Sequence, residues 1–405
     1  MAETETQHVS YGGRLKNSLG GVATGFLLFI GATVLLWWNE GRAVKTAKAI
    51  NETEELCVEM DNINKVDPQF NGQVVHATGD AVTKDSLVEA DFGAGAVAVK
   101  LSRKVEFYQY QEEKHEETKD NVGGSQDKTI TYTYKETWTD SPVNSGSFKD
   151  PAYQNKNFVY MNFESKDTYA ENVSFGAYKL NEKQVQAISG DVAADLNVTS
   201  SQISTWNKAC AAVAKSRGLN ASDSLVHVDG NVVYYGLNPN SPQIGDVRVT
   251  FTKVLPGAIS IIAKVSGNTF TDYIAKNKKS FSRLEMGTKD ASEMFENSRD
   301  ENSILTWILR VLGVILVIVG LRNVFDILVS LLKVLPPLAT VANLGIGLVC
   351  GVVGLVWSLL VIAIAWIFYR PLLGIVILVA VGALVYYLNK RSKAKKLAEA
   401  DNAQA

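Results

Sequence analysis

Four long apolar runs constrain the fold of this chain more than any other feature. Residues 338–368 contain no charged side chain, and a second apolar run, 372–388, follows after three residues. Two apolar runs lie earlier in the chain. Residues 19–38 contain no charged side chain, and residues 304–321 contain only Arg310. Because a helix crosses the hydrocarbon core in about 20 residues, the runs predict four transmembrane helices. The predicted spans are residues 19–38, 304–321, 344–368 and 372–388.

Basic residues near the two ends of the chain indicate the orientation of the spans. Arg14 and Lys16 precede the first span, and a cluster of cations follows the last: Lys390, Arg391, Lys393, Lys395 and Lys396. By the positive-inside rule, we expect the tails 1–18 and 389–405 on the cytoplasmic or nucleoplasmic side. The first span is then an uncleaved signal anchor, and residues 39–303 lie in a periplasm or a lumen.

The stretch 39–303 is long enough to bury a core of its own. Its apolar patterning predicts one α+β domain with a mostly antiparallel sheet. A long β-hairpin is predicted from residues 105–119 and 129–138, and a second hairpin from residues 246–254 and 258–265. Further strands are expected at residues 73–80, ending in a glycine turn, and at residues 97–101. Helices are expected at residues 41–56, 182–189, 201–217 and 289–302.

Residues 322–343, between the second and third spans, are mixed in character. Asp326 and Lys333 interrupt the apolar residues, and Pro336 and Pro337 end any helix there. We therefore expect a short amphipathic helix at residues 323–335, lying in the inner membrane interface.

The cysteines leave one question open. Cys350 falls within a span, so Cys57 and Cys210 either form the one disulfide available in an oxidising compartment or remain two thiols. Asn-X-Ser/Thr sequons are also present, but polar loops produce such triplets by chance and they do not identify the host. The sequons lie at Asn51, Asn172, Asn197 and Asn220.

Six short motifs follow one another from the first predicted span to the last. They are residues 39–47 (NEGRAVKTA), 72–76 (GQVVH), 99–110 (VKLSRKVEFYQY), 244–249 (IGDVRV), 306–310 (TWILR) and 366–371 (WIFYRP). In this order, and with this layout of spans, the chain resembles the LUMA family of four-span membrane proteins. The resemblance is thinner in residues 187–225 and at both termini.

This resemblance implies a large lumenal domain and self-association. For eukaryotic members it implies a role in organising the inner nuclear membrane with lamins and emerin, and prokaryotic chains of the same layout exist. The expected location is therefore the endoplasmic reticulum or inner nuclear membrane in a eukaryote, and the cytoplasmic membrane in a bacterium. No catalytic residues are established for the family, so none are carried over.

The chain has no recognisable catalytic or cofactor motif. It lacks His-Glu-x-x-His, paired Cys-x-x-Cys, Gly-x-Ser-x-Gly and a phosphate-binding glycine loop, so we predict no enzyme activity, cofactor or metal. His76, His115 and His227 fall on separate predicted strands, which disfavours a metal cluster. The carboxylate-rich run 112–117 is typical of a solvated hairpin arm. A net charge of −2 gives no indication of a nucleic-acid partner.

We predict a self-associating membrane scaffold that contacts membrane lipids and other membrane proteins. The alternative is a channel, transporter or channel-regulating subunit assembled as an oligomer. Conduction requires polar groups along the path. Within residues 338–368 the notable polar side chains are Asn343 and Ser358, which disfavours a pore through one protomer but leaves an oligomeric pore open.

Small residues in the spans are candidates for close helix contacts. Gly21 and Gly25 in the first span, and Gly347 and Gly351 in the third, have the four-residue spacing that lets helix backbones approach. These glycines either pack the spans of one chain together or form contacts between protomers.

Four charged residues are expected at one membrane boundary beneath the domain: Glu40, Arg42, Arg310 and Arg370. Arg310 lies about 9 Å into the second span at 1.5 Å per residue. It either reaches back to the headgroups or pairs with Glu40. In the second case, Arg42 and Arg370 complete a charged collar that fixes the domain to the helices or holds an anionic lipid headgroup.

Overall fold

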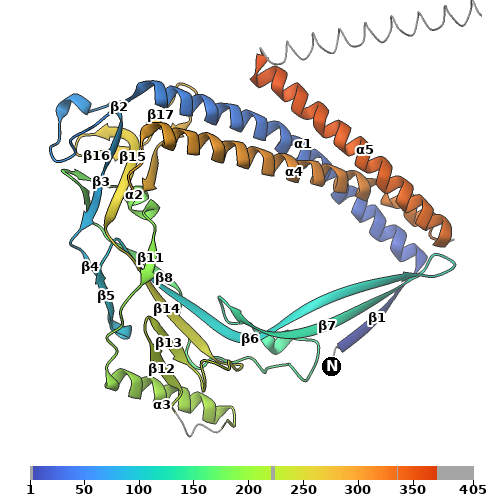
Figure 1. The fold of residues 1–405 in the computed structure, drawn as a ribbon. Coiled ribbons are helices and arrows are strands. Elements are labelled where there is room, and N and C mark those ends of the chain that lie inside the picture. Colours follow the sequence, from blue (N-terminus) through green and yellow to red (C-terminus); the bar gives the residue numbers. More distant parts are fainter. Residues whose placement is uncertain (1–2, 220–223, 335, 372–405) are drawn as a thin grey trace, which may run out of the picture. The chain divides into compact units, whose positions relative to one another are not determined.

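The computed structural model describes residues 3–219, 224–334 and 336–371 (Figure 1). The fourth predicted span, residues 372–388, and the basic tail 389–405 lie outside this part of the chain. Two compact units are present. The β unit comprises the described residues of Met1–Gln7, Asn51–Thr118 and Lys128–Asn297, and the helical unit comprises those of His8–Ile50, Lys119–Asp127 and Ser298–Ala405.

An eight-stranded sheet forms one half of the β unit. Its order is β1-β7-β6-β14-β13-β12, with β11 paired to β14 and β8 paired to β6. The strands are β1 (Glu3–Val9), β6 (Lys100–Asp120), β7 (Gln126–Thr139), β8 (Lys166–Tyr169), β11 (Asp191–Ala193), β12 (Val226–Asp229), β13 (Val232–Tyr235) and β14 (Val247–Val254). The predicted long hairpin is confirmed as β6 and β7, which extend beyond the predicted residues at both ends.

A second sheet of seven strands contains a closed ring of pairings. β3 pairs with β15 and β9, β10 joins β9 to β16, and β16 returns to β15, while β2 and β19 extend from β3 and β15. The strands are β2 (Cys57–Glu59), β3 (Val74–Thr83), β9 (Val173–Phe175), β10 (Tyr178–Lys179), β15 (Gly257–Ser266), β16 (Thr269–Thr271) and β19 (Arg283–Met286). Two small pairs complete the unit: β4 (Ser86–Glu89) with β5 (Ala94–Val97), and β17 (Tyr273–Ile274) with β18 (Ser280–Phe281). Antiparallel pairing predominates, which confirms the predicted α+β class.

The predicted hairpin of residues 246–254 and 258–265 is wrong. β14 pairs with β6 and β13 in the first sheet, whereas β15 pairs with β3 and β19 in the second (Figure 1). The turn between them therefore carries the chain from one sheet to the other. The reason is that β15 is buried on both faces over five consecutive residues, which suits a central strand between β3 and β19.

Two shorter strand predictions are also corrected. β3 does not end at Gly79 but continues through it to Thr83. A Cβ at Gly79 would lie 2.3 Å from the Ile63 Cδ1 atom, so the glycine admits a neighbouring side chain and makes no turn. The strand predicted at residues 97–101 is divided, because β5 ends at Val97 and β6 begins at Lys100.

Two helices of the β unit confirm the sequence predictions. α2 (Glu182–Ala187) and α3 (Ser200–Ser216) both begin with a capping box, from Asn181 and Thr199 respectively. Trp206, Cys210 and Ala214 recur every four residues on α3 and are buried against the eight-stranded sheet.

The three cysteines are free thiols. Cys210 is buried on α3 against the eight-stranded sheet, and Cys57 lies in β2 of the seven-stranded sheet. Burial raises the pKa of each of these two thiols to about 12, so both are protonated at neutral pH.

Three long helices form most of the helical unit: α1 (Tyr11–Leu56), α4 (Ala291–Leu332) and α5 (Pro336–Tyr369). Within the described residues, these are the helices long and apolar enough to cross a membrane. α1 contains the first predicted span and the predicted stalk 41–56 in one continuous helix. α4 likewise joins the predicted polar helix 289–302 to the second span.

The separate amphipathic helix predicted at residues 323–335 is not present, because α4 continues without a break to Leu332. No proline or glycine follows Gly320 before Pro336, so nothing in the sequence interrupts the helix there.

Glycines bring α1 and α4 into close contact. A Cβ at Gly25 would lie 2.7 Å from the Gly320 carbonyl oxygen, and a Cβ at Gly320 would lie 2.7 Å from the Phe29 amide nitrogen. A Cβ added at a third glycine, Gly354 of α5, would lie 2.7 Å from the Cγ1 atom of Ile318 on α4. Small residues therefore set the spacing of the three helices.

The tip of the β6–β7 hairpin, residues 119–127, packs on the start of α1. Arg14, with only 5 % of its surface exposed, donates from Nη1 to the carbonyl oxygens of Gly124 (3.1 Å) and Ser125 (3.2 Å). Its Nη2 lies 2.7 Å from the Asp120 carboxylate. The Gly123 amide donates to the Val334 carbonyl at 3.0 Å, so the residues that directly follow α4 join the contact. We call this contact the tip latch.

Candidate functional site

One buried carboxylate joins the three long helices. Glu40 of α1 is fully buried, and its two oxygens accept hydrogen bonds from Arg310 of α4, from Nε at 2.6 Å and from Nη2 at 2.8 Å. Trp366 of α5 donates its indole N–H to Glu40 Oε2 at 2.8 Å. We call these three residues the Glu40 clamp. A two-point arginine–carboxylate contact with a third donor is a strong, directional arrangement.

A second set of polar groups lies beside the clamp on α1 and α4. Asn39 donates to the Thr306 carbonyl oxygen at 3.0 Å. Arg42 donates to Asn39 Oδ1, to Asn302 Oδ1 (3.1 Å) and to Thr306 Oγ1 (2.8 Å). Each of these oxygens is neutral. The polar contact between α1 and α4 therefore extends over two turns of helix.

Helical spacing explains why these residues meet. Asn302, Thr306 and Arg310 recur every four residues and form one stripe on α4. Asn39 and Arg42 lie three residues apart on α1 and face the same stripe. Placing all polar groups on facing stripes satisfies them inside the chain, which is required where water is scarce.

Aromatic rings surround the guanidinium groups. The Arg310 guanidinium lies 4.8 Å from the Trp307 ring and 5.6 Å from the Trp366 ring. The Arg370 guanidinium lies 5.9 Å from the same Trp366 ring. These cation–π contacts stabilise charge that is partly withdrawn from water.

Gly41 has a specific steric role next to the clamp. A Cβ at this position would lie 2.7 Å from Cζ of Tyr369, so only glycine lets the Tyr369 ring lie against α1. The Trp37 ring of α1 also contacts this tyrosine, with centroids 5.7 Å apart.

The structure thus brings together Glu40, Arg42 and Arg310, and it places Arg370 beside them through Trp366. Sequence reasoning missed Trp366, Asn39 and Thr306, although the four-residue stripe on α4 was a signal that could have found the last of these. Of the four glycines proposed for close helix contacts, Gly25 packs against α4 within the chain. A Cβ added at Gly21, Gly347 or Gly351 meets nothing within 4 Å among the described residues.

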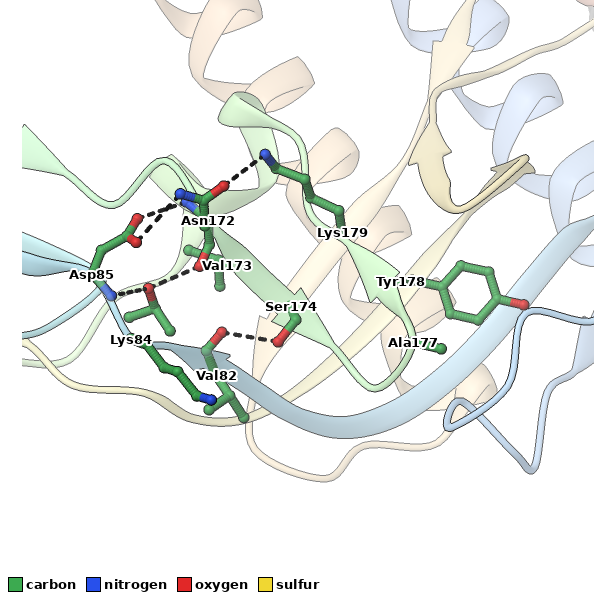
Figure 2. Close-up of a pocket in the computed structure, with 10 residues that line it drawn as sticks. Val82, Lys84, Asp85, Asn172, Val173, Ser174, Ala177, Tyr178 and Lys179 are labelled. Atoms are coloured by element: carbon green, nitrogen blue, oxygen red, sulfur yellow. Dashed lines mark hydrogen bonds between the residues drawn. The ribbon is translucent and has the colours of Figure 1, made fainter.

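A shallow cavity of about 320 Å³ lies at the β3–β9–β10 edge of the β unit (Figure 2). Asp85 accepts hydrogen bonds from the Glu171 and Asn172 amides at 2.8 and 2.7 Å, and Lys179 donates to the Asn172 side chain at 3.1 Å. Hydrogen bonds to its carboxylate hold the pKa of Asp85 below its usual range, and the bond from the Asn172 backbone amide has the largest effect. The polar groups of this cavity therefore bond to one another, and we assign no ligand to it.

The carboxylate-rich run on β6 pairs across the hairpin. Glu116 contacts Lys128 and Glu113 contacts Lys135, both across the hairpin on β7, and Glu116 also contacts Lys114 on its own strand. Across the described residues, no group of three or more His, Cys, Asp and Glu side chains is placed to hold a metal ion.

Asp246 is the most perturbed carboxyl group of the β unit. It is buried, and Oδ2 accepts hydrogen bonds from Tyr234 Oη and from the Gln243 amide, while Oδ1 has no hydrogen-bond partner. Burial raises the pKa of Asp246 to about 6. Its hydrogen-bond partners, Tyr234 and the Gln243 amide, are groups of the same β unit. We therefore connect the raised pKa of Asp246 with the stability of the β unit and assign it no catalytic role.

Long apolar helices joined by a buried polar clamp, with a large antiparallel β domain in the same chain, define a membrane protein with several candidate spans. Comparison with known proteins identifies the group within this class. A family profile described as "Transmembrane protein 43" matches residues 107–371, so the chain belongs to the transmembrane protein 43 (LUMA) family, as the resemblance predicted.

Relatives match along almost the whole chain. "Transmembrane protein 43" of Homo sapiens is 31 % identical over 402 residues, covering 95 % of this chain and 93 % of the relative. The Mus musculus protein of that name is 30 % identical over 400 residues, covering 95 % and 93 %. "Transmembrane protein 43 homolog" of Drosophila melanogaster is 27 % identical over 370 residues, covering 89 % and 92 %. No solved structure matches the chain.

Proposed function

We propose that this protein is a membrane scaffold, in which a clamped bundle of apolar helices anchors the β unit to the bilayer. The observation that carries the proposal is the Glu40 clamp. One carboxylate with donors from two other helices makes the bundle a single rigid anchor, as a scaffold requires, and Glu40 makes three hydrogen bonds within the chain that occupy both its oxygens.

We propose further that protomers associate through α5. Leu344 and Leu348 are 72 % and 71 % exposed, and the nearby Gly347 and Gly351 have no described neighbour within 4 Å of an added Cβ. Apolar side chains beside two open glycines form the kind of face on which a second helix packs closely.

We infer that the scaffold organises the membrane in which it resides, through contacts with lipids and with other membrane proteins. The LUMA resemblance supports the endoplasmic reticulum or inner nuclear membrane in a eukaryotic host, and the cytoplasmic membrane in a bacterial one. We propose no catalytic role.

Cross-linking in native membranes, followed by mass measurement in mild detergent, tests self-association. The wild-type chain should run as an oligomer, and Gly347→Leu combined with Gly351→Leu should reduce the particle to one chain. Gly31→Leu on α1, where an added Cβ also meets nothing described, is the matched control and should leave the mass unchanged. A single-chain mass for the wild type would remove the proposal, and large homomeric rings would favour the channel alternative.

A further inference from the structure

The clamp and the residues beside it carry more positive than negative charge. Glu40 and the three guanidinium groups of Arg42, Arg310 and Arg370 form a charged cluster with a single carboxylate. Both oxygens of that carboxylate are occupied by Arg310 and Trp366. The hydrogen bonds of Arg42 go to neutral oxygens. Within the cluster, therefore, two positive charges have no carboxylate in contact with them.

Arg370 is the guanidinium group best placed to receive an external anion. It directly follows α5 and is partly exposed. Among the described residues, its recorded side-chain contact is the Trp366 ring. A guanidinium group has five N–H donors in a planar fork that matches the oxygens of a phosphate. A ring contact satisfies none of them.

Exposed aromatic side chains indicate what lies around Arg370. Trp38 of α1, Trp307 of α4 and Phe368 of α5 are 53 %, 61 % and 69 % exposed, and each lies within three residues of a member of the cluster. Tryptophan is enriched where the hydrocarbon of a membrane meets the headgroups. The cluster therefore lies at the depth of lipid phosphates.

We propose that Arg370 binds the headgroup of an anionic phospholipid, with the charge of Arg42 adding to the attraction. The acyl chains of this lipid lie along the exposed side chains of Trp307 and Phe368. The proposal rests on the transmembrane placement of the helices but not on self-association, so the oligomeric mass measured above does not bear on it.

The test compares two lipids of matched acyl chains, phosphatidylglycerol and phosphatidylcholine, added to the purified full chain in neutral detergent. Lipid retained on the protein is counted by native mass spectrometry, and the midpoint of thermal unfolding is recorded with each lipid. Wild-type protein should retain phosphatidylglycerol preferentially and melt at a higher temperature with it. Arg370→Gln should weaken this retention at least about tenfold, as expected for the loss of a charged hydrogen-bond donor.

Two further variants define the site. Arg370→Lys keeps the charge and should retain part of the preference. Arg322→Gln removes a guanidinium group elsewhere on α4, where it donates to Asn343 at 3.2 Å, and should leave the preference intact. Equal retention of the two lipids by wild type, or an unchanged preference in Arg370→Gln, would overturn the proposal. An equal thermal shift with inorganic phosphate would also overturn it, because a free anion would then be the ligand.

Discussion

Glu40 and Arg310 lie 270 residues apart in the sequence and meet in a two-point ion pair between α1 and α4. Only 12 % of the Arg310 side chain is exposed, and Glu40 is fully buried. Such a pair is costly to break from one side, because the remaining charge is left without compensation.

The first prediction follows from this asymmetry. Glu40→Gln and Arg310→Gln should each destabilise the bundle by about 3–5 kcal/mol, and the double variant should be no less stable than either single one. The midpoint of thermal unfolding in detergent, followed by tryptophan fluorescence, measures all three. Strictly additive losses would show that the two side chains act independently.

Trp366→Phe provides a graded version of the same experiment. It keeps an aromatic ring beside Arg310 but removes the indole donor to Glu40, so we expect a smaller loss of about 1.5–3 kcal/mol. A loss as large as that of Glu40→Gln would indicate that ring packing, not the hydrogen bond, dominates at this position.

The glycine contacts predict opposite outcomes for two neighbouring positions on α1. Gly25→Leu should separate α1 from α4, because an added Cβ already lies 2.7 Å from Asn323 Cβ and from the Gly320 oxygen. Gly21→Leu should be tolerated, since nothing described lies within 4 Å of its added Cβ. Yield of monodisperse protein and the thermal midpoint compare the pair, and equal behaviour would contradict the α1–α4 packing.

The raised pKa of Asp246 predicts how the stability of the β unit depends on pH. The folded carboxyl titrates at about pH 6 and the unfolded one near pH 4, so the folded chain binds the proton more tightly. The associated stabilisation is present below about pH 4 and is lost as the pH rises through about 6, a change of about 3 kcal/mol. Asp246→Asn should flatten the thermal midpoint between about pH 4.5 and about pH 7. Asp195→Asn, at an exposed ion pair with Lys253, should retain the slope.

The tip latch predicts that the start of α1 and the tip of the β6–β7 hairpin lie on the same side of the membrane. Charge distribution predicted residues 1–18 and 39–303 on opposite sides of the membrane, yet Arg14 contacts Gly124 and Ser125 directly. We therefore expect Gly12→Cys and the 84 % exposed Val122→Cys to react with a membrane-impermeant maleimide from the same side of sealed vesicles, in a chain carrying Cys57→Ser. Reaction from opposite sides would contradict the latch and support the charge rule.

Local periodicity predicted most elements of this chain but not their pairing. Apolar periodicity predicted the long hairpin, in which Ile130 and Tyr132 are buried on one face, and α3, in which Trp206 and Cys210 are buried. The prediction of the second hairpin was wrong because the turn residues Leu255 and Pro256 do not specify whether the strands on either side pair with each other. The choice of partner strand depends on contacts distant in sequence. The same limit applies to the clamp. Pairing of Glu40 with Arg310 was one of two alternatives that topology and charge left open. The Trp366 donor depends on the rotation of α5 about its axis, which no local sequence pattern specifies.

The latch also sets an order of events during synthesis. Its three parts are made far apart in time: Tyr11, whose hydroxyl donates to the Leu331 carbonyl, is translated 320 residues before its partner. At about 5–20 residues per second, this interval is roughly 16–64 s. In its later part, once residue 127 has been made, the hairpin tip exists without the end of α4. The hydrogen bond from Gly123 to Val334 likewise waits for the residues that follow α4. The latch of a newly made chain therefore closes completely only after α4 has been made.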